Sequence, residues 1–203
     1  NYNYNPSSPY SASKAGADQL VRSYGRTYGI KTLIANPCNN YGPNQFPEKF
    51  IPKMIFNILN NKPLPVYGKG KNIREWIYVQ DNCEALLKIF LRGKIGKSYN
   101  IGTGIKLKNI EIVKKLLDIA KKNRIKVTKK NKIKFVMDRP GHDVRYALNS
   151  GRIRREIKWK NKTPISEGLS KTIYWYSKNL NYFKKISKKN ITKRLGLNIW
   201  KKK

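Results

Sequence analysis

The stretch PYSASKAGADQLVRSYGRTYGIKTLIAN, residues 9–36, decides the fold class. Apolar side chains recur in it at helical spacing, at Ala17, Leu20, Val21 and Tyr24. They predict a helix over residues 10–28 that ends at Gly29. A short apolar run, residues 32–36, follows closely and is typical of a strand buried in a parallel sheet. A helix that leads directly into a buried strand predicts an α/β fold.

The rest of the chain repeats this alternation. We expect strands at 63–70, 74–79 and 97–102, and helices at 53–60, 81–92, 110–122 and from Thr163 onward. Asp81 and Asn109 are the predicted caps of two of these helices. The helix over 81–92 has an expected buried face made of Ala85, Leu86, Ile89 and Phe90. Residues 39–52 contain too many Gly, Pro and Asn for regular structure and predict a loop that carries function.

The composition is strongly basic. Lys and Arg number 45 and Asp and Glu 11, which gives a net charge of +34. Such an excess can indicate binding to nucleic acid or to an anionic membrane. The abundance of Lys, Asn and Ile offers another explanation, because coding DNA rich in A and T imposes it on any protein. The hydrophobic content of 39% argues against a disordered polycation, so we expect a globular protein.

Membrane and metal sites have no support in the sequence. No apolar run approaches the roughly 20 residues that span a bilayer, and Cys38 and Cys83 lack metal-ligand spacing. We therefore expect no membrane partner and no metal, in a reducing cytoplasm. The chain begins with Asn1 rather than Met, and a loop leads directly into its first helix, so we expect a fragment of a longer protein.

Tyr10 and Lys14 form the clearest candidate for chemistry. They stand four residues apart at the start of the predicted helix, so their side chains share one face. An adjacent ammonium favours the ionised form of a phenol, which suits a general base that takes a proton from an alcohol. A Lys-rich chain also produces such a pair by chance, so its context decides what it means.

That context is a series of sequence blocks. PYSASK at 9–14, followed by NPCNNYGP at 36–43, resembles the extended short-chain dehydrogenase/reductase family, which acts on nucleotide sugars. More narrowly, the chain is similar to the nucleotide-sugar 4,6-dehydratases of that family in four blocks: YGPNQFPEKFIPKMI, PLPVYGKGKNIREWIYVQD, YNIGTG and DRPGHDVRYA. They begin at residues 41, 63, 99 and 138.

The resemblance implies an NAD-dependent lyase that converts dTDP-glucose to dTDP-4-keto-6-deoxyglucose and water. Tyr10 would be the base at the sugar 4-hydroxyl, Lys14 would bind the nicotinamide ribose, and Asn40 would face the cofactor. Substrate contacts are implied for Asn39, Lys49, Phe50, Pro65, Val66, Tyr67, Arg74, Asn109, Arg139 and His142. The family's glycine-rich NAD turn and its Asp–Glu pair for elimination are not in this chain.

The implied architecture is a partial Rossmann-type parallel sheet plus a smaller α/β substrate-binding domain. Residues 1–40 and 82–102 would form the carboxyl-terminal part of the NAD-binding domain. Residues 41–81 and 103–185 would bind the nucleotide sugar, and residues 186–203 would form a basic tail. The resemblance also implies a homodimer for the complete protein.

The chain departs from the family pattern at four positions. Glu75 and Gln80 stand where Asp and Glu are usual, Cys38 where Ser is common, and Ile191 where a Tyr that contacts the nucleotide is expected. These departures concern substrate affinity more than the type of reaction.

Two alternatives to the dehydratase remain. A nucleotide-sugar epimerase that uses NAD would share Tyr10 and Lys14. A basic nucleic-acid-binding protein without enzymatic activity would explain the charge, although the basic tail lacks the interleaved aromatic residues of RNA-binding segments. Without their motif, Arg74 and Arg139 would be ordinary surface cations, and Asn109 would be only a helix cap.

Overall fold

The first helix forms as the sequence predicts. The chain is seen here as a computed structural model that describes residues 5–138 and 143–186. Helix α1 spans Pro9–Tyr28. The Ser8 hydroxyl caps it by accepting a hydrogen bond from the Ser11 amide at 3.2 Å, and Gly29 ends it in the left-handed region, with φ 67°. Its side chains are half-buried or exposed, and none is buried.

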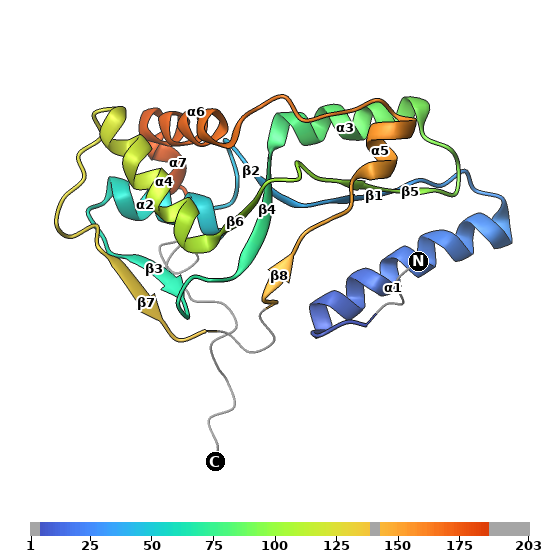
Figure 1. Cartoon of the computed structure of the whole chain (residues 1–203), viewed down its shortest axis with the longest axis horizontal. Helices are drawn as coiled ribbons and strands as arrows, with labels where there is room; N and C mark the ends of the chain where they lie inside the picture. Colours follow the sequence, from blue (N-terminus) through green and yellow to red (C-terminus); the bar gives the residue numbers. More distant parts are fainter. Residues whose placement is uncertain (1–4, 139–142, 187–203) are drawn as a thin grey trace, which may run out of the picture.

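A parallel strand pair follows α1. Strand β1 (Ile34–Pro37) pairs in parallel with β5 (Ser98–Ile101). Helix α3 (Val79–Arg92) lies on one side of this pair and α1 on the other (Figure 1). The smaller hydrophobic core lies here and consists of Cys38, Ile77, Ala85, Ile89, Tyr99, Ile101, Ile153, Ile157 and Trp159. Ile153 belongs to the short helix α5 (Gly151–Glu156), and Ile157 and Trp159 follow it. The sequence did not predict this helix.

Strand β4 (Ile73–Tyr78) is the centre of the second sheet. It pairs in parallel with β2 (Asn39–Tyr41) and β8 (Arg145–Tyr146), and antiparallel with β6 (Lys106–Lys108). A separate parallel pair joins β3 (Leu64–Tyr67) to β7 (Ile133–Val136). Parallel strands alternating with helices confirm the predicted α/β class.

Four helices enclose the larger core. They are α2 (Phe50–Leu59), α4 (Asn109–Lys122), α6 (Ile165–Lys178) and α7 (Leu180–Lys184). Trp76 and Tyr78 of β4 belong to this core, whereas Ile77 belongs to the smaller one. Because successive side chains of a strand point to opposite faces, β4 separates the two cores.

Several expectations about individual elements are wrong. The predicted loop over 39–52 begins with β2, which finds its hydrogen-bonding partner in β4, far along the chain. Asp81 does not cap α3, since Tyr78 holds that position. The Asp81 carboxylate instead accepts hydrogen bonds from the backbone amides of Lys162 and Thr163 and from the Thr163 hydroxyl.

The ends and faces of two helices also differ from expectation. Asn109 is the first residue of α4 and not its cap, and the Glu111 carboxylate accepts a hydrogen bond from the Lys108 amide before it. On α3, Leu86 is 40% exposed and Phe90 77% exposed, so the predicted buried face holds only for Ala85 and Ile89. Leu87 and Leu91 of this helix are exposed as well.

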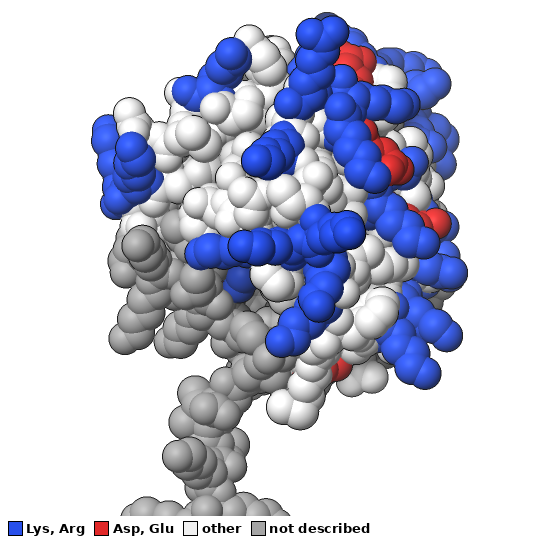
Figure 2. Space-filling view, turned by 90° about the vertical axis from the view of Figure 1, so that its left-hand side faces the viewer, with Lys and Arg blue, Asp and Glu red and all other residues white. Residues whose placement is uncertain are grey.

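The surface charge is spread out. Figure 2 looks at the side that carries α2, α4, β3 and β7 and shows Lys and Arg scattered across it, with uncharged surface between them. None of the helices described in the structure combines the length with the apolar character that a bilayer span requires.

Candidate functional site

Tyr10 and Lys14 lie on the first turns of α1 with accessible side chains. The Tyr10 ring is 74% exposed, and Lys14 is exposed as well. Their spacing places both on one face of the helix. A ligand can therefore reach the phenol and the ammonium together.

Asp143 links the start of α1 to β4. The Ser7 hydroxyl donates to the Asp143 carboxylate at 3.1 Å. The Asp143 carbonyl accepts from the Arg74 guanidinium at 2.7 Å and from the Asn72 side-chain amide at 3.2 Å. The structure thus brings together the YxxxK helix, the strand that carries Arg74 and the segment after DRPGH.

Arg74 is not a surface cation. It is 7% exposed, and its guanidinium also donates to the Ile73 carbonyl at 2.8 Å. Nearby, the buried Asn109 donates its backbone amide to the Asn72 carbonyl at 3.1 Å. A largely desolvated guanidinium fixed by backbone acceptors is suited to a strong contact with a phosphate oxygen.

Tyr146 lies within electrostatic reach of Tyr10. Burial raises the pKa of the Tyr146 phenol, and the charges of Cys38 and Tyr10 raise it further. Burial together with the charge of Glu75 raises the pKa of the Cys38 thiol to about 12. These residues bring β4, β8 and the junction between β1 and β2 to one region beside the base helix.

The Glu75 side chain holds neighbouring segments of this region together. Its carboxylate is fully buried and accepts hydrogen bonds from the backbone amides of Gly104 and Leu148. The segment after β5 and the segment after β8 are thereby held to β4. Sequence comparison marked Glu75 only as a departure, and nothing in its neighbours along the chain indicates these two partners.

Asn39 and Asn40 lie on β2, opposite Trp76 and Ile77 of β4. The Asn40 amide donates to the Cys38 carbonyl at 3.2 Å, and the Asn40 carbonyl accepts from the Gln45 side chain at 2.8 Å. The Asn40 Oδ1 atom is buried without a hydrogen-bond partner among the described residues. It is available to a donor on a ligand.

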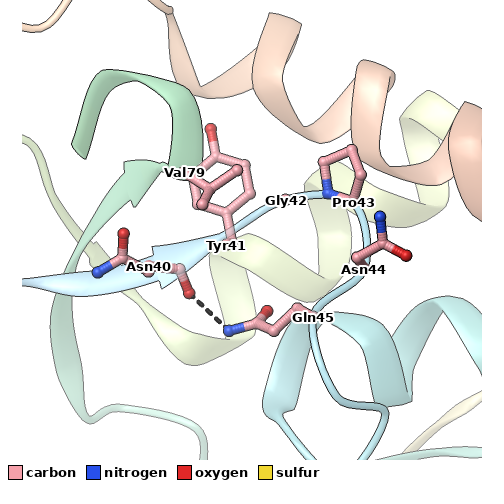
Figure 3. A pocket seen from close by; sticks show the side chains of 7 residues that line it. All are labelled: Asn40, Tyr41, Gly42, Pro43, Asn44, Gln45 and Val79. Atoms are coloured by element: carbon pink, nitrogen blue, oxygen red, sulfur yellow. Dashed lines mark hydrogen bonds between the residues drawn. The ribbon is translucent and has the colours of Figure 1, made fainter. Parts of the chain in front are cut away.

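A small hollow opens beside Asn40. It has a volume of about 210 Å³ and is lined by Val79 and by the segment from Asn40 to Gln45. Figure 3 shows the Gln45 side chain directed back to the Asn40 carbonyl, which folds this segment into a tight turn.

The other predicted substrate contacts lie at the start of α2 and on β3. Lys49 is exposed and pairs with Glu48 at 3.6 Å, and the Phe50 ring stacks on Trp76 with 5.9 Å between centroids. On β3, Val66 is buried in the larger core, and Pro65 and Tyr67 are half-buried. Arg139 and His142, like Ile191, lie outside the described residues.

The part of the chain that the structure describes contains no cluster of three His, Cys, Asp or Glu side chains that could hold a metal ion. Cys38 and Cys83 are both free, the first buried and the second exposed.

Asp143 is the residue in this region that sequence reasoning missed. The signal for it was present, because it belongs to the quoted DRPGHD block.

Comparisons with known proteins give a matching family model and several similar relatives. The family model described as GDP-mannose 4,6 dehydratase matches residues 1–172. The dTDP-glucose 4,6-dehydratase of Salmonella typhimurium is 48% identical over 180 residues, which cover 88% of this chain and 50% of that protein. The chain spans about half the length of the curated relatives it matches.

Solved structures of several enzymes are similar to this chain in fold. DesIV, a dTDP-glucose 4,6-dehydratase from Streptomyces venezuelae with NAD and TYD bound, is 40% identical with a TM-score of 0.83. The match covers 89% of this chain and 54% of DesIV. A UDP-glucuronic acid 4-epimerase from Bacillus cereus is 22% identical with a TM-score of 0.79, which shows a shared fold alone.

Proposed function

The chain belongs to the GDP-mannose 4,6-dehydratase family, and from this premise we propose that it supplies the base helix and the nucleotide-sugar site of an NAD-dependent dTDP-glucose 4,6-dehydratase. The observation that carries the proposal is the meeting at Asp143 of the Tyr10 helix and the buried Arg74. A base for a sugar hydroxyl and a cation for a diphosphate are thus joined in one site. The relatives at 48% and 40% identity bear the same activity in their names.

Proton transfer is the part of the reaction that falls to this chain. Tyr10 takes the proton of the sugar 4-hydroxyl, and Lys14 binds the nicotinamide ribose. When bound, NAD would supply the acceptor for the hydride of C4 and the donor of that hydride to C6, where its return is balanced by a proton added at C5. The 4-keto group acidifies C5, so that water can be lost across C5 and C6.

The residues present fit one side of the cofactor. The unpartnered Asn40 Oδ1 can accept a hydrogen bond from an amide or a hydroxyl group of NAD. The 203 residues contain no G-x-x-G-x-x-G turn to hold the pyrophosphate. We therefore expect both this turn and the Asp–Glu pair for elimination to come from residues outside these 203.

In this proposal the nucleotide of the substrate binds to the domain that contains the larger core. Arg74, Asn109, Arg139 and His142 would hold the diphosphate and ribose, and Pro65, Val66 and Tyr67 would form the wall around the nucleobase. Asn39, Lys49 and Phe50 complete the pocket. In this proposal residues 1–40 and 82–102 belong to the NAD-binding domain, residues 41–81 and 103–185 to the nucleotide-sugar domain, and residues 186–203 to a basic tail. The larger core supports the division, because all of its residues fall in the nucleotide-sugar ranges. The smaller core crosses the division, because it joins Ile77, Ile153, Ile157 and Trp159 to residues of the NAD-binding ranges.

A homodimer in the cytoplasm completes the proposal. The support for a dimer is α1, which buries none of its side chains and exposes Leu20, Tyr24 and Tyr28. Such an apolar helix face is typical of a protein interface.

Calorimetry of the 203-residue chain with dTDP tests the nucleotide site. We expect saturable binding at one site per chain, and the Arg74→Ala variant should lose about 2–5 kcal/mol of binding free energy because the guanidinium is desolvated. The matched control is Arg92→Ala, which removes a cation from the exposed end of α3. Equal losses in the two variants would show that dTDP responds only to the overall charge.

Arg74 is buried, so its removal can also weaken the fold. The thermal midpoint of each variant is therefore measured first. Tyr67→Ala provides a second variant, since Tyr67 is half-buried on β3 at the proposed nucleobase wall. If dTDP binding is unaffected in a folded Tyr67→Ala chain, the nucleobase does not lie against β3.

A further inference from the structure

A second hollow lies away from the base helix. It has a volume of about 430 Å³. Its lining comes from the segment after β5, from β6, from β8 and its continuation, and from α5: Gly104, Lys106, Arg145, Ala147, Leu148, Asn149, Ser150, Gly151 and Arg154. Nothing in the proposed dehydratase reaction uses these residues.

The hollow is lined by three cations and by no acid. Lys106, Arg145 and Arg154 come from β6, β8 and α5. None of the three forms an ion pair within the described parts of the chain, and the Arg154 guanidinium makes a 3.3 Å hydrogen bond to the Thr103 carbonyl. Cations gathered without a counter-charge around a concave surface attract an anion.

Ser150 lines the hollow, but its hydroxyl does not face it. The residue is 6% exposed, and its Oγ atom is buried. A Cβ atom at Gly102 would meet both this Oγ and the Glu75 carboxylate, so the hydroxyl lies behind the lining, beside Glu75. The neighbouring Asn149 side chain is already engaged, because it accepts the Gly151 amide at 2.9 Å.

The second hollow and the proposed nucleotide site lie on opposite sides of β4. Arg74 and Glu75 are adjacent in the strand, so their side chains point to opposite faces. Glu75 is bonded to the amides of Gly104 and Leu148, which both line the hollow. Arg74 is bonded to Asp143, near the start of α1.

The Glu75 carboxylate lies close to the hollow. It lies behind the lining rather than in it, and both of its oxygens accept backbone amides. Three cations face the hollow against this one covered carboxylate, so the local balance still favours an anion.

We propose that the second hollow binds the phosphoryl group of a small molecule, at a site separate from that for dTDP. A phosphoryl group offers three or more oxygens in a tetrahedral arrangement, which matches two guanidinium groups and an ammonium that approach from different elements. A carboxylate offers only two oxygens in one plane and satisfies fewer of these donors. The hollow is large enough to take the rest of a small phosphorylated molecule.

Calorimetry with inorganic phosphate at constant ionic strength tests the site in the unmodified chain, and repeating it in the presence of saturating dTDP removes any contribution of the proposed dTDP site. We expect one saturable site per chain and at least a tenfold loss of affinity in the double variant Arg145→Ala/Arg154→Ala. The matched control is Arg92→Ala/Lys94→Ala, with the same loss of charge at an exposed position and an expected change of less than twofold. Equal losses in both would overturn the proposal in favour of diffuse attraction to the net charge.

Two further ligands identify the chemistry. Acetate should bind at least tenfold more weakly than phosphate, and equal affinity would exclude a phosphoryl site. Ribose 5-phosphate distinguishes the sources: binding as tight as that of phosphate assigns an esterified phosphoryl group, and weaker binding assigns free phosphate. A failure of dTDP to bind the unmodified chain would leave this site untouched, so the two proposals fail separately.

Discussion

Tyr10 owes its proposed role to its place at the first turn of α1. Its ring is exposed, and Lys14 follows on the same face. Tyr10→Phe removes only the hydroxyl that transfers the proton, so the fold and dTDP binding should persist. We expect turnover to fall by about 10² to 10⁴. The assay combines this chain with the amino-terminal half of the Salmonella typhimurium relative.

Tyr28→Phe is the matched control for that change. Tyr28 lies at the other end of the same helix and is 68% exposed. It should keep full turnover. If Tyr10→Phe and Tyr28→Phe have equal activity, Tyr10 is not the base.

Cys38 makes stability depend on alkaline pH. Burial and the charge of Glu75 raise the pKa of its thiol from 9.0 to about 12. Because the folded chain holds this proton more tightly than the unfolded chain, the resulting stability is fully present below pH 9 and is lost as the pH rises toward 12. The free energy of unfolding should fall by about 1.4 kcal/mol per pH unit in this window from this group.

Urea unfolding at pH 8.5, about 9.5 and about 10.5 measures that slope. Cys38→Ala should flatten it, whereas Cys83→Ala should not, because Cys83 is exposed. The phenols of Tyr41 and Tyr176 also have raised pKa values through burial, so some alkaline loss remains in both variants. Parallel slopes for the unmodified chain and Cys38→Ala would contradict the assignment to Cys38.

At the scale of elements, the contact between α6 and β2 depends on a glycine. A Cβ atom at Gly168 would come within 2.2 Å of the Tyr41 hydroxyl oxygen and 2.9 Å of its ring. Tyr41 is buried in the larger core and has no room to yield. Gly168→Ala should therefore destabilise the chain by about 1–3 kcal/mol, although alanine is the better helix former.

Gly16→Ala is the control, because a Cβ atom there meets nothing within 4 Å. Gly16 lies inside α1, where alanine should stabilise by about 0.5–1 kcal/mol. Urea unfolding of both variants measures whether the free energy of unfolding falls in Gly168→Ala and rises in Gly16→Ala. A stabilised Gly168→Ala chain would mean that α6 does not pack closely on Tyr41.

For the whole molecule, two helices leave apolar surface uncovered. Helix α1 exposes Leu20 and Tyr24, and α3 exposes Leu87, Phe90 and Leu91. Strand β1 has one partner in its sheet among the described residues, β5. Such faces and edges favour aggregation or association with further protein.

We expect the 203-residue chain to convert no dTDP-glucose by itself and to bind NAD too weakly to detect at micromolar concentration, since it contains no glycine-rich pyrophosphate turn. Adding the amino-terminal half of the Salmonella typhimurium relative should restore both properties. Measurement of the 4-keto product with and without that half checks this. Turnover by the chain alone would show that it holds every group the reaction needs.

Local patterns in the sequence predicted the type of most elements. The period of apolar residues located α1, α4 and α6, and short apolar runs located β1, β4 and β5, because each signal lies within a few neighbouring residues. Short elements such as β2, β6 and α5 were missed. Their hydrogen bonds or packing depend on partners distant in the chain.

For the candidate site too, the sequence predicted some features and the structure decided others. Motifs identified Tyr10, Lys14, Arg74 and Asn40, because the type and order of these residues are properties of the chain itself. The structure alone decided that Arg74 is buried and that Asp143 joins it to the start of α1, since those facts depend on segments 69 and 136 residues apart. The sequence by itself determined the family and the α/β class, and it predicted the candidate base. Tertiary structure decided which groups meet, which carboxylates are covered and where the cations converge on the second hollow, because burial and proximity arise only when distant segments pack together.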